Sequence, residues 1–157
     1  MSFLSCLKAQ NDSICGIFPQ KEGIVFYTGI VGIDSLSAKQ LYLNTKIWIS
    51  GSFGSAKVVT EADVENSFLS IKGLVNLLYT KNFKLKFTMN FYLKDCRLKY
   101  EVTDIYLLNS AFNSENHIEK IPAVRECFLK TASEFVETLK SVIESYLTKM
   151  KSLSNDW

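Results

Sequence analysis

The sequence contains one histidine and four cysteines, the residue types that most often carry catalysis or hold metal ions. His117 lies in a polar stretch with no nucleophile or metal-ligand partner nearby in the sequence, so it gives acid–base catalysis little support. None of the cysteines stand in CxxC spacing, and the P-loop, zincin, nucleophile-elbow and dinucleotide motifs are missing. We therefore expect no enzymatic activity and no cofactor or metal ion.

Two short stretches resemble ligand sites only superficially. Gly51 and Gly54 follow a predicted helix, whereas phosphate-binding loops precede one, so these glycines are interpreted as the end of that helix. Glu61, Asp63 and Glu65 could converge on a cation, but they lack the glycine and the number of oxygens of a calcium loop. A solvated turn is the favoured interpretation of these carboxylates.

The segment 81–99 is strongly basic, with six Lys and Arg residues against one Asp, although the whole chain has a net charge of only +2. Basic residues with an aromatic residue on one strand face could contact phosphates and stack a base. Lysines on a wet strand face also commonly serve solubility and prevent edge pairing, so nucleic-acid binding is the less favoured interpretation. The candidate residues of an open binding face are Lys84, Lys86, Tyr92, Lys94 and Lys99.

Strict alternation of apolar and polar residues from Phe83 to Lys94 predicts a strand with one buried face. Asp95-Cys96 is then a two-residue turn into a second strand, so that the segment forms a long antiparallel hairpin. The apolar phase changes at Asp104-Ile105, where a β-bulge would restore the register.

Two helices are expected to cover this hairpin, one over about 38–51 and one over about 123–151. Ser37 and Gln40 form a capping box before the first helix, and Gly51 and Gly54 are expected to end it. Further strands are predicted at 23–31, 56–61 and 67–75, with 11–22 a loop or edge strand and 109–120 irregular.

These elements predict a single two-layer α+β domain over residues 11–157, in which two helices pack on one face of a curved antiparallel sheet of about five to six strands. Aromatic side chains would meet between the sheet and the second helix. A packed core is favoured there, and a cavity for a small apolar ligand is the alternative. The residues that would line that cavity are Phe83, Phe87, Phe91, Phe128, Phe135 and Tyr146.

The first helix and the segment after it contain Leu41, Tyr42, Trp48 and Phe53, and then Ser55-Ala56-Lys57-Val58-Val59. This pattern resembles a bacterial domain-of-unknown-function family described as having a TBP-like fold. The resemblance covers about residues 23–108 and implies the fold and an export route in Gram-negative bacteria, but no activity. One departure is Asp95-Cys96, because the family usually has Asp-Gly in this turn and a type I′ turn suits Gly better than Cys.

The first ten residues look like the last part of a secretory signal peptide, and an apolar N-terminal strand or tail is the alternative. No uncharged stretch approaches the ~18–20 apolar residues of a membrane-spanning helix. In an oxidising compartment two cysteines could pair, but spacing does not show which, and Cys127 is expected to be buried on a helix. The remaining cysteines are Cys6, Cys15 and Cys96.

The sequence therefore favours an exported, non-enzymatic binding or structural module of the cell envelope; without a leader the protein would be cytoplasmic. Another envelope protein or a small apolar ligand is the expected partner. The first alternative function is a carrier of a small apolar ligand, and the second is binding of an anionic polymer or nucleic acid on the open sheet face.

Overall fold

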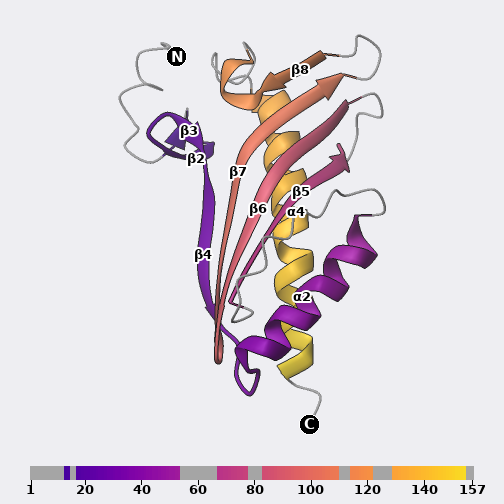
Figure 1. Cartoon of the computed structure of the whole chain (residues 1–157). Coiled ribbons are helices and arrows are strands. Elements are labelled where there is room, and N and C mark those ends of the chain that lie inside the picture. The colour runs from indigo at the N-terminus through magenta and orange to yellow at the C-terminus, as the bar shows by residue number, and fades with distance from the viewer. Residues whose placement is uncertain are drawn as a thin grey trace.

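A five-stranded antiparallel sheet forms the centre of the molecule (Figure 1). The computed structural model describes residues 13–14, 17–53, 67–77, 83–109, 114–121 and 129–154. The strand order is β4-β7-β6-β5, and β8 pairs with the far half of β7 on the edge that β4 leaves free. The strands are β4 (Tyr27–Gly32), β5 (Phe68–Asn76), β6 (Phe83–Lys94), β7 (Arg97–Asn109) and β8 (Ser114–His117).

The N-terminal part forms a separate small sheet of β1 (Ser13–Ile14), β2 (Phe18–Lys21) and β3 (Ile24–Val25). The strand predicted at 23–31 is divided between β3 and β4 at Phe26, whose N–H donates to the carbonyl of Pro19 at 3.0 Å. Only the second half of that apolar run therefore enters the main sheet.

The predicted hairpin is confirmed by β6 and β7. Leu85, Phe87, Met89, Phe91 and Leu93 are at most 1% exposed, whereas the residues between them are half-buried or exposed. The pairing shifts by one residue between Lys86 and Thr88, and Asp104 opposite this shift has a φ of 50°. This is the predicted β-bulge, which returns Ile105 to the buried face.

The hairpin closes through Asp95 and Cys96, as predicted, with Lys94 paired to Arg97. Cys96 has a φ of 59°, whereas Asp95 is not in the positive-φ region, so the turn is not type I′. Backbone hydrogen bonds hold Cys96 in this conformation: its N–H donates to Leu36 at 2.8 Å and its carbonyl accepts from Ile33 at 3.0 Å. The turn thus holds a cysteine in a left-handed backbone conformation that favours glycine.

Helix α2 (Ala38–Ser52) begins with the predicted capping box, in which Ser37 and Gln40 satisfy each other's backbone N–H groups. The predicted helix over about 38–51 is confirmed to within one residue, although Gly51 is not the residue that ends it. The helix continues through Gly51, and Phe53 ends it by donating its N–H to the carbonyl of Ile49 while its ring enters the core.

Helix α4 (Leu129–Ser154) lies along the sheet, and α2 crosses its C-terminal half (Figure 1). At ~1.5 Å per residue, the 26 residues of α4 span about 39 Å. The predicted helix over about 123–151 buries one apolar face from Phe135 onward, made of Phe135, Leu139, Ile143, Tyr146 and Met150. The predicted irregular stretch 109–120 is partly wrong, because it contains β8 and the 3-10 helix η1 (Ile118–Lys120).

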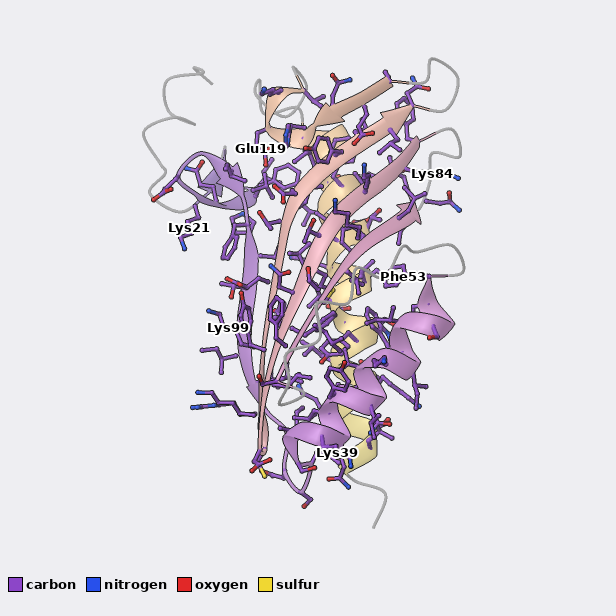
Figure 2. All side chains as sticks on the ribbon, in the orientation of Figure 1. Lys21, Lys39, Phe53, Lys84, Lys99 and Glu119 are labelled. Atoms are coloured by element: carbon purple, nitrogen blue, oxygen red, sulfur yellow. The ribbon has the colours of Figure 1, made fainter. Side chains whose placement is uncertain are left out.

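Both helices pack on the same face of the sheet, and Trp48 lies at their junction. Its ring is 4.9 Å from that of Tyr146 on α4 and 6.2 Å from that of Phe91 on β6. Phe53 is on this helix side of the molecule in Figure 2, whereas Lys99 projects to the other side. The two-layer arrangement is therefore as the sequence predicted, with the far face of the sheet free of these helices (Figure 1).

Some of the predictions concern residues outside those that the structure describes. They are the possible leader at 1–10, the strand at 56–61, the acidic stretch 61–65, the helix start at 122–128 with Cys127 and Phe128, and the remaining cysteines Cys6 and Cys15.

Candidate binding surface on the open sheet face

Strand pairing brings four side chains into one row across the open face, near the β6–β7 turn. Ile30 pairs with Lys99, Lys99 pairs with Tyr92, and Tyr92 pairs with Phe68. The row therefore crosses β4, β7, β6 and β5 in turn. Ile30 is 68% exposed and Tyr92 39%, so this part of the sheet presents apolar and aromatic surface to solvent.

Tyr92 is held on both sides within this row. Its ring centroid is 5.1 Å from that of Phe68, and the Lys99 ammonium lies 5.2 Å from the same ring. The phenol hydrogen-bonds to the Glu101 carboxylate, and this bond, followed by partial burial, raises the pKa of Tyr92 above its usual value. The hydroxyl is therefore a neutral, oriented group at neutral pH.

Three cations surround a hollow next to this row. Lys94 and Arg97 face each other directly across the hairpin, and Lys99 is two pairs further along, on the same face. The hollow has a volume of about 330 Å³. Its lining residues are Ile30, Tyr92, Lys94, Arg97, Leu98 and Lys99. We call it the hairpin hollow.

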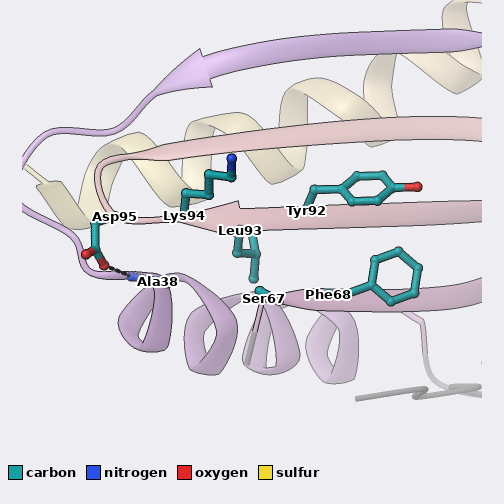
Figure 3. A pocket seen from close by; sticks show the side chains of 7 residues that line it. All are labelled: Ala38, Ser67, Phe68, Tyr92, Leu93, Lys94 and Asp95. Carbon is teal, nitrogen blue, oxygen red and sulfur yellow. Dashed lines mark hydrogen bonds between the residues drawn. The ribbon is translucent and has the colours of Figure 1, made fainter. Parts of the chain in front are cut away.

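A second, more open hollow of about 630 Å³ lies on the other side of Tyr92 and Lys94, toward helix α2 (Figure 3). Phe68 on β5 and Ser67 just before it form one side, and Ala38 and Asp95 close the end. The Asp95 carboxylate accepts a hydrogen bond from the Ala38 N–H at 2.8 Å. It thus places a negative charge at the start of α2, whose first turn contains no acidic residue of its own.

The far end of the open face has a different character. Lys86 forms an ion pair with Glu115 on β8 at 2.9 Å, and its ammonium lies 5.6 Å from the Tyr106 ring. His117 stacks on Tyr106 with ring centroids 4.0 Å apart, and its Nδ1 is 3.7 Å from Glu119. His117 is therefore placed among an aromatic ring and a carboxylate, without a nucleophile among these contacts.

The predicted open-face residues do share one face, but the structure divides them into two groups. Tyr92, Lys94 and Lys99 lie by the turn, whereas Lys84 and Lys86 lie near β8, six to ten residues away along β6. At a rise of about 3.3 Å per residue, roughly 30 Å separates the two ends. One small ligand cannot contact both groups.

The residues predicted to line an apolar cavity mostly contact other aromatic rings. Phe91 lies 4.7 Å from Tyr146, and Phe87 lies 6.0 Å from Phe53. The Tyr146 hydroxyl lies 2.9 Å from the Thr45 hydroxyl, within hydrogen-bonding distance. Phe135 is buried and Phe83 is half-buried, while Phe128 lies outside the described residues. This packing is typical of a protein core, so it favours that interpretation over a ligand cavity.

The residues of α2 and its end that carried the family resemblance are structural, whereas residues 55–59 of the same pattern lie outside those that the structure describes. Leu41, Tyr42, Trp48 and Phe53 are at most 7% exposed, and all belong to the hydrophobic core. Trp48 also donates its indole N–H to Ser145 of α4 at 3.2 Å. This part of the pattern therefore specifies how α2 packs, and it contributes no group to the open face.

Three lining residues of the hairpin hollow were not among the predicted open-face residues: Ile30, Arg97 and the buried Leu98. Arg97 was visible only as part of the basic segment 81–99, because its pairing with Lys94 depends on the turn closing after two residues. Ile30 belongs to an apolar run that reads as buried, and only its position on the outer side of β4 exposes it. Periodicity along one strand cannot show which residues meet across strands.

Two findings limit the chemistry of the described part of the chain. No group of three or more His, Cys, Asp or Glu side chains there is placed to hold a metal ion. No helix among the described residues is long and apolar enough to cross a membrane. The Cys96 thiol at the hairpin turn is free and exposed.

Comparison with known proteins agrees with the fold. A TBP-like protein from Parabacteroides distasonis superposes with a TM-score of 0.66 at 16% identity, covering 86% of this chain and 97% of that one. A DUF4468 family protein from Bacteroides ovatus gives a TM-score of 0.68 at 11% identity, covering 86% and 91%. No curated protein matches the sequence.

Two helices over one face of an antiparallel sheet thus define this protein as a small α+β domain with a TBP-like fold. The sequence profile of the domain of unknown function DUF4468, described as having this fold, matches residues 27–107. The chain belongs to the DUF4468 family.

Proposed function

We propose that this protein is a non-enzymatic binding module of the cell envelope, and that it binds through the open face of its sheet. The observation that carries the proposal is the contrast between a filled core and a cationic outer face. Among the described residues, three acidic residues share that face: Glu101, Asp104 and Glu115. Its six cations are Lys72, Lys84, Lys86, Lys94, Arg97 and Lys99.

Charge complementarity makes the partner of this face anionic. The same argument favours the open face over the interior as the binding region. A carrier of an apolar ligand would need space between the sheet and α4, where Phe91, Tyr146 and Trp48 already touch one another. Carrying an apolar ligand is therefore the less favoured function, and binding an anionic partner is the more favoured one.

Export rests on the resemblance of the first ten residues to the end of a signal peptide. Fractionation of the native host tests it, with an antibody against the protein and marker enzymes for each compartment. Recovery with periplasmic or membrane markers supports an envelope role. Recovery with cytoplasmic markers contradicts it.

Retention of the full chain on heparin and on single-stranded DNA columns tests the open face. We expect salt-dependent retention, weakened in a variant in which Lys72, Lys86 and Lys99 are changed to Gln. A matched control changes Lys39, Lys46 and Lys149, which lie on the helices. Loss of retention in the control variant alone, or no retention at low salt, contradicts the proposal.

A further inference from the structure

We propose that the hairpin hollow is a binding site for a phosphate or sulfate ester of a sugar-sized molecule. Lys94, Arg97 and Lys99 hold the oxyanion, and the carbon skeleton lies against the exposed Ile30 side chain. The inference rests on the proposed function, because it selects one site and one ligand class within the open face.

The first argument is charge. Like charges directly opposite each other on neighbouring strands are destabilising, yet Lys94 faces Arg97. Within the part of the chain that the structure describes, neither cation has an acidic side chain within ion-pair distance, whereas Lys86 at the far end has Glu115 at 2.9 Å. Asp95 is adjacent in sequence, but one of its oxygens accepts from the Ala38 N–H. An anionic ligand would relieve the repulsion at the turn.

The second argument is the arrangement of donors. Arginine presents a planar fork of N–H groups that matches phosphate and sulfate oxygens, and two lysines add mobile point charges. Lys99 is positioned by its contact with the Tyr92 ring and by Glu101 at 3.9 Å. That ion pair is long, so the Lys99 ammonium retains hydrogen-bonding capacity for a ligand.

The third argument is the apolar wall. Ile30 is 68% exposed and is the exposed aliphatic side chain in the lining of the hollow. The other lining side chains are cationic or aromatic, except Leu98, which is buried. A volume of about 330 Å³ is at the lower end of the range for small-molecule sites. It suits a single sugar ring with its charged substituent better than a bare ion, which would leave Ile30 without a contact.

Single-stranded nucleic acid is the competing ligand, and the geometry of Tyr92 argues against it. Base stacking needs a free aromatic face. Lys99 lies over the Tyr92 ring and Phe68 packs beside it, so the ring is already engaged by its neighbours.

Amide NMR titrations of the full chain test the site, with glucose 6-phosphate, glucose 6-sulfate, inorganic phosphate, glucose and a thymidine oligonucleotide as probes. We expect millimolar concentrations of either ester to shift the amides of Ile30, Tyr92, Lys94, Arg97 and Lys99, and glucose to leave them unmoved. Equal binding of inorganic phosphate would overturn the ester, and preferential binding of the oligonucleotide would overturn the ligand class.

Arg97→Ala should weaken ester binding by about tenfold, because it removes charge-assisted hydrogen bonds. Lys84→Ala is the matched control: it removes one positive charge from the same face at the far end and should leave the affinity within about twofold. An unchanged melting temperature shows that each variant is folded. Equal losses in the two variants contradict a localised site, and heparin retention without any ester binding refutes the hollow while leaving the proposed function intact.

Discussion

The two faces of the five-stranded sheet use aromatic residues in different ways. On the helix side, Phe91 is fully buried and touches the rings of both Trp48 and Tyr146. On the open side its neighbour in sequence, Tyr92, is 39% exposed and contacts a lysine. Adjacent residues of one strand thus serve stability and surface chemistry separately. Substitutions on the two faces should affect different measurements.

The largest difference is expected between Phe91→Ala and Tyr92→Ala. Removing the buried ring should cost about 3–5 kcal/mol of unfolding free energy, since it leaves a cavity between β6 and both helices. Removing the exposed ring should cost about 1 kcal/mol or less, the value of a cross-strand pair. Urea unfolding monitored by circular dichroism measures both losses. Similar losses would contradict the claim that the buried ring contributes to stability far more than the exposed one.

Two glycines provide a second comparison of the faces. A Cβ at Gly73 would lie 2.6 Å from the buried Phe87 ring, whereas one at Gly32 would meet nothing within 4 Å. Gly73→Ala should therefore cost about 1–3 kcal/mol through overpacking. Gly32→Ala should be neutral or stabilising by about 0.4–1 kcal/mol, because it restricts the unfolded chain. The same unfolding assay decides, and a neutral Gly73→Ala would show that Phe87 can move aside.

Alkaline pH should weaken the helix-side face. Burial raises the pKa of Tyr27 and Tyr146 well above the usual value near 10. The unfolded chain therefore releases these protons at lower pH than the folded chain does. The contribution of the two hydroxyls to the free energy of unfolding is constant below about pH 10 and falls as pH rises through the folded-state pKa. Melting temperatures from pH 8 upward should fall less steeply in a variant with both tyrosines changed to Phe.

The same two tyrosines should differ at neutral pH. Tyr146→Phe loses the contact with Thr45 and should cost about 1 kcal/mol. Tyr27→Phe should be neutral or stabilising, because the buried Tyr27 hydroxyl has no hydrogen-bond partner among the described residues. A loss of about 1 kcal/mol in Tyr27→Phe would contradict this assignment.

The smallest effects are expected on the open face. Lys94→Glu places opposite charges across the hairpin and should stabilise the protein by about 0.2–1 kcal/mol. Lys86→Ala removes the Glu115 pair and should cost a similar amount. Urea midpoints measure the stability of both variants. Elution from heparin at lower salt should show that Lys94→Glu binds anions more weakly although it is more stable. A destabilised Lys94→Glu would indicate that Lys94 has a structural role.

Much of the helix-side face could be predicted because its signals are local. Alternation over Phe83–Lys94, the Ser37–Gln40 capping box and the phase change at Asp104 each lie within a few residues of one another. Each depends on backbone geometry that neighbouring side chains impose directly. These features were predicted at the correct positions.

The open face could be predicted only in part, because its contacts depend on pairing between distant strands. Ile30 reaches Lys99 through the β4–β7 register, and Lys86 reaches Glu115 on a strand that was expected to be irregular. The sequence of β8 is polar, which suits an edge strand but gives no apolar alternation. Its strand conformation follows from its pairing with β7. Propensity alone does not detect such a strand.

The hydrogen bond between the Asp95 carboxylate at the hairpin turn and the Ala38 N–H at the start of α2 implies an order of events in folding. The β6–β7 turn closes locally, which takes about 1–10 μs for a hairpin, whereas the Asp95–Ala38 bond joins positions 57 residues apart. We expect α2 to gain its acidic cap only after the hairpin exists. The amides of Ala38 and Cys96 should therefore become protected from hydrogen exchange together and later than those within β6, since the opening that frees one frees the other.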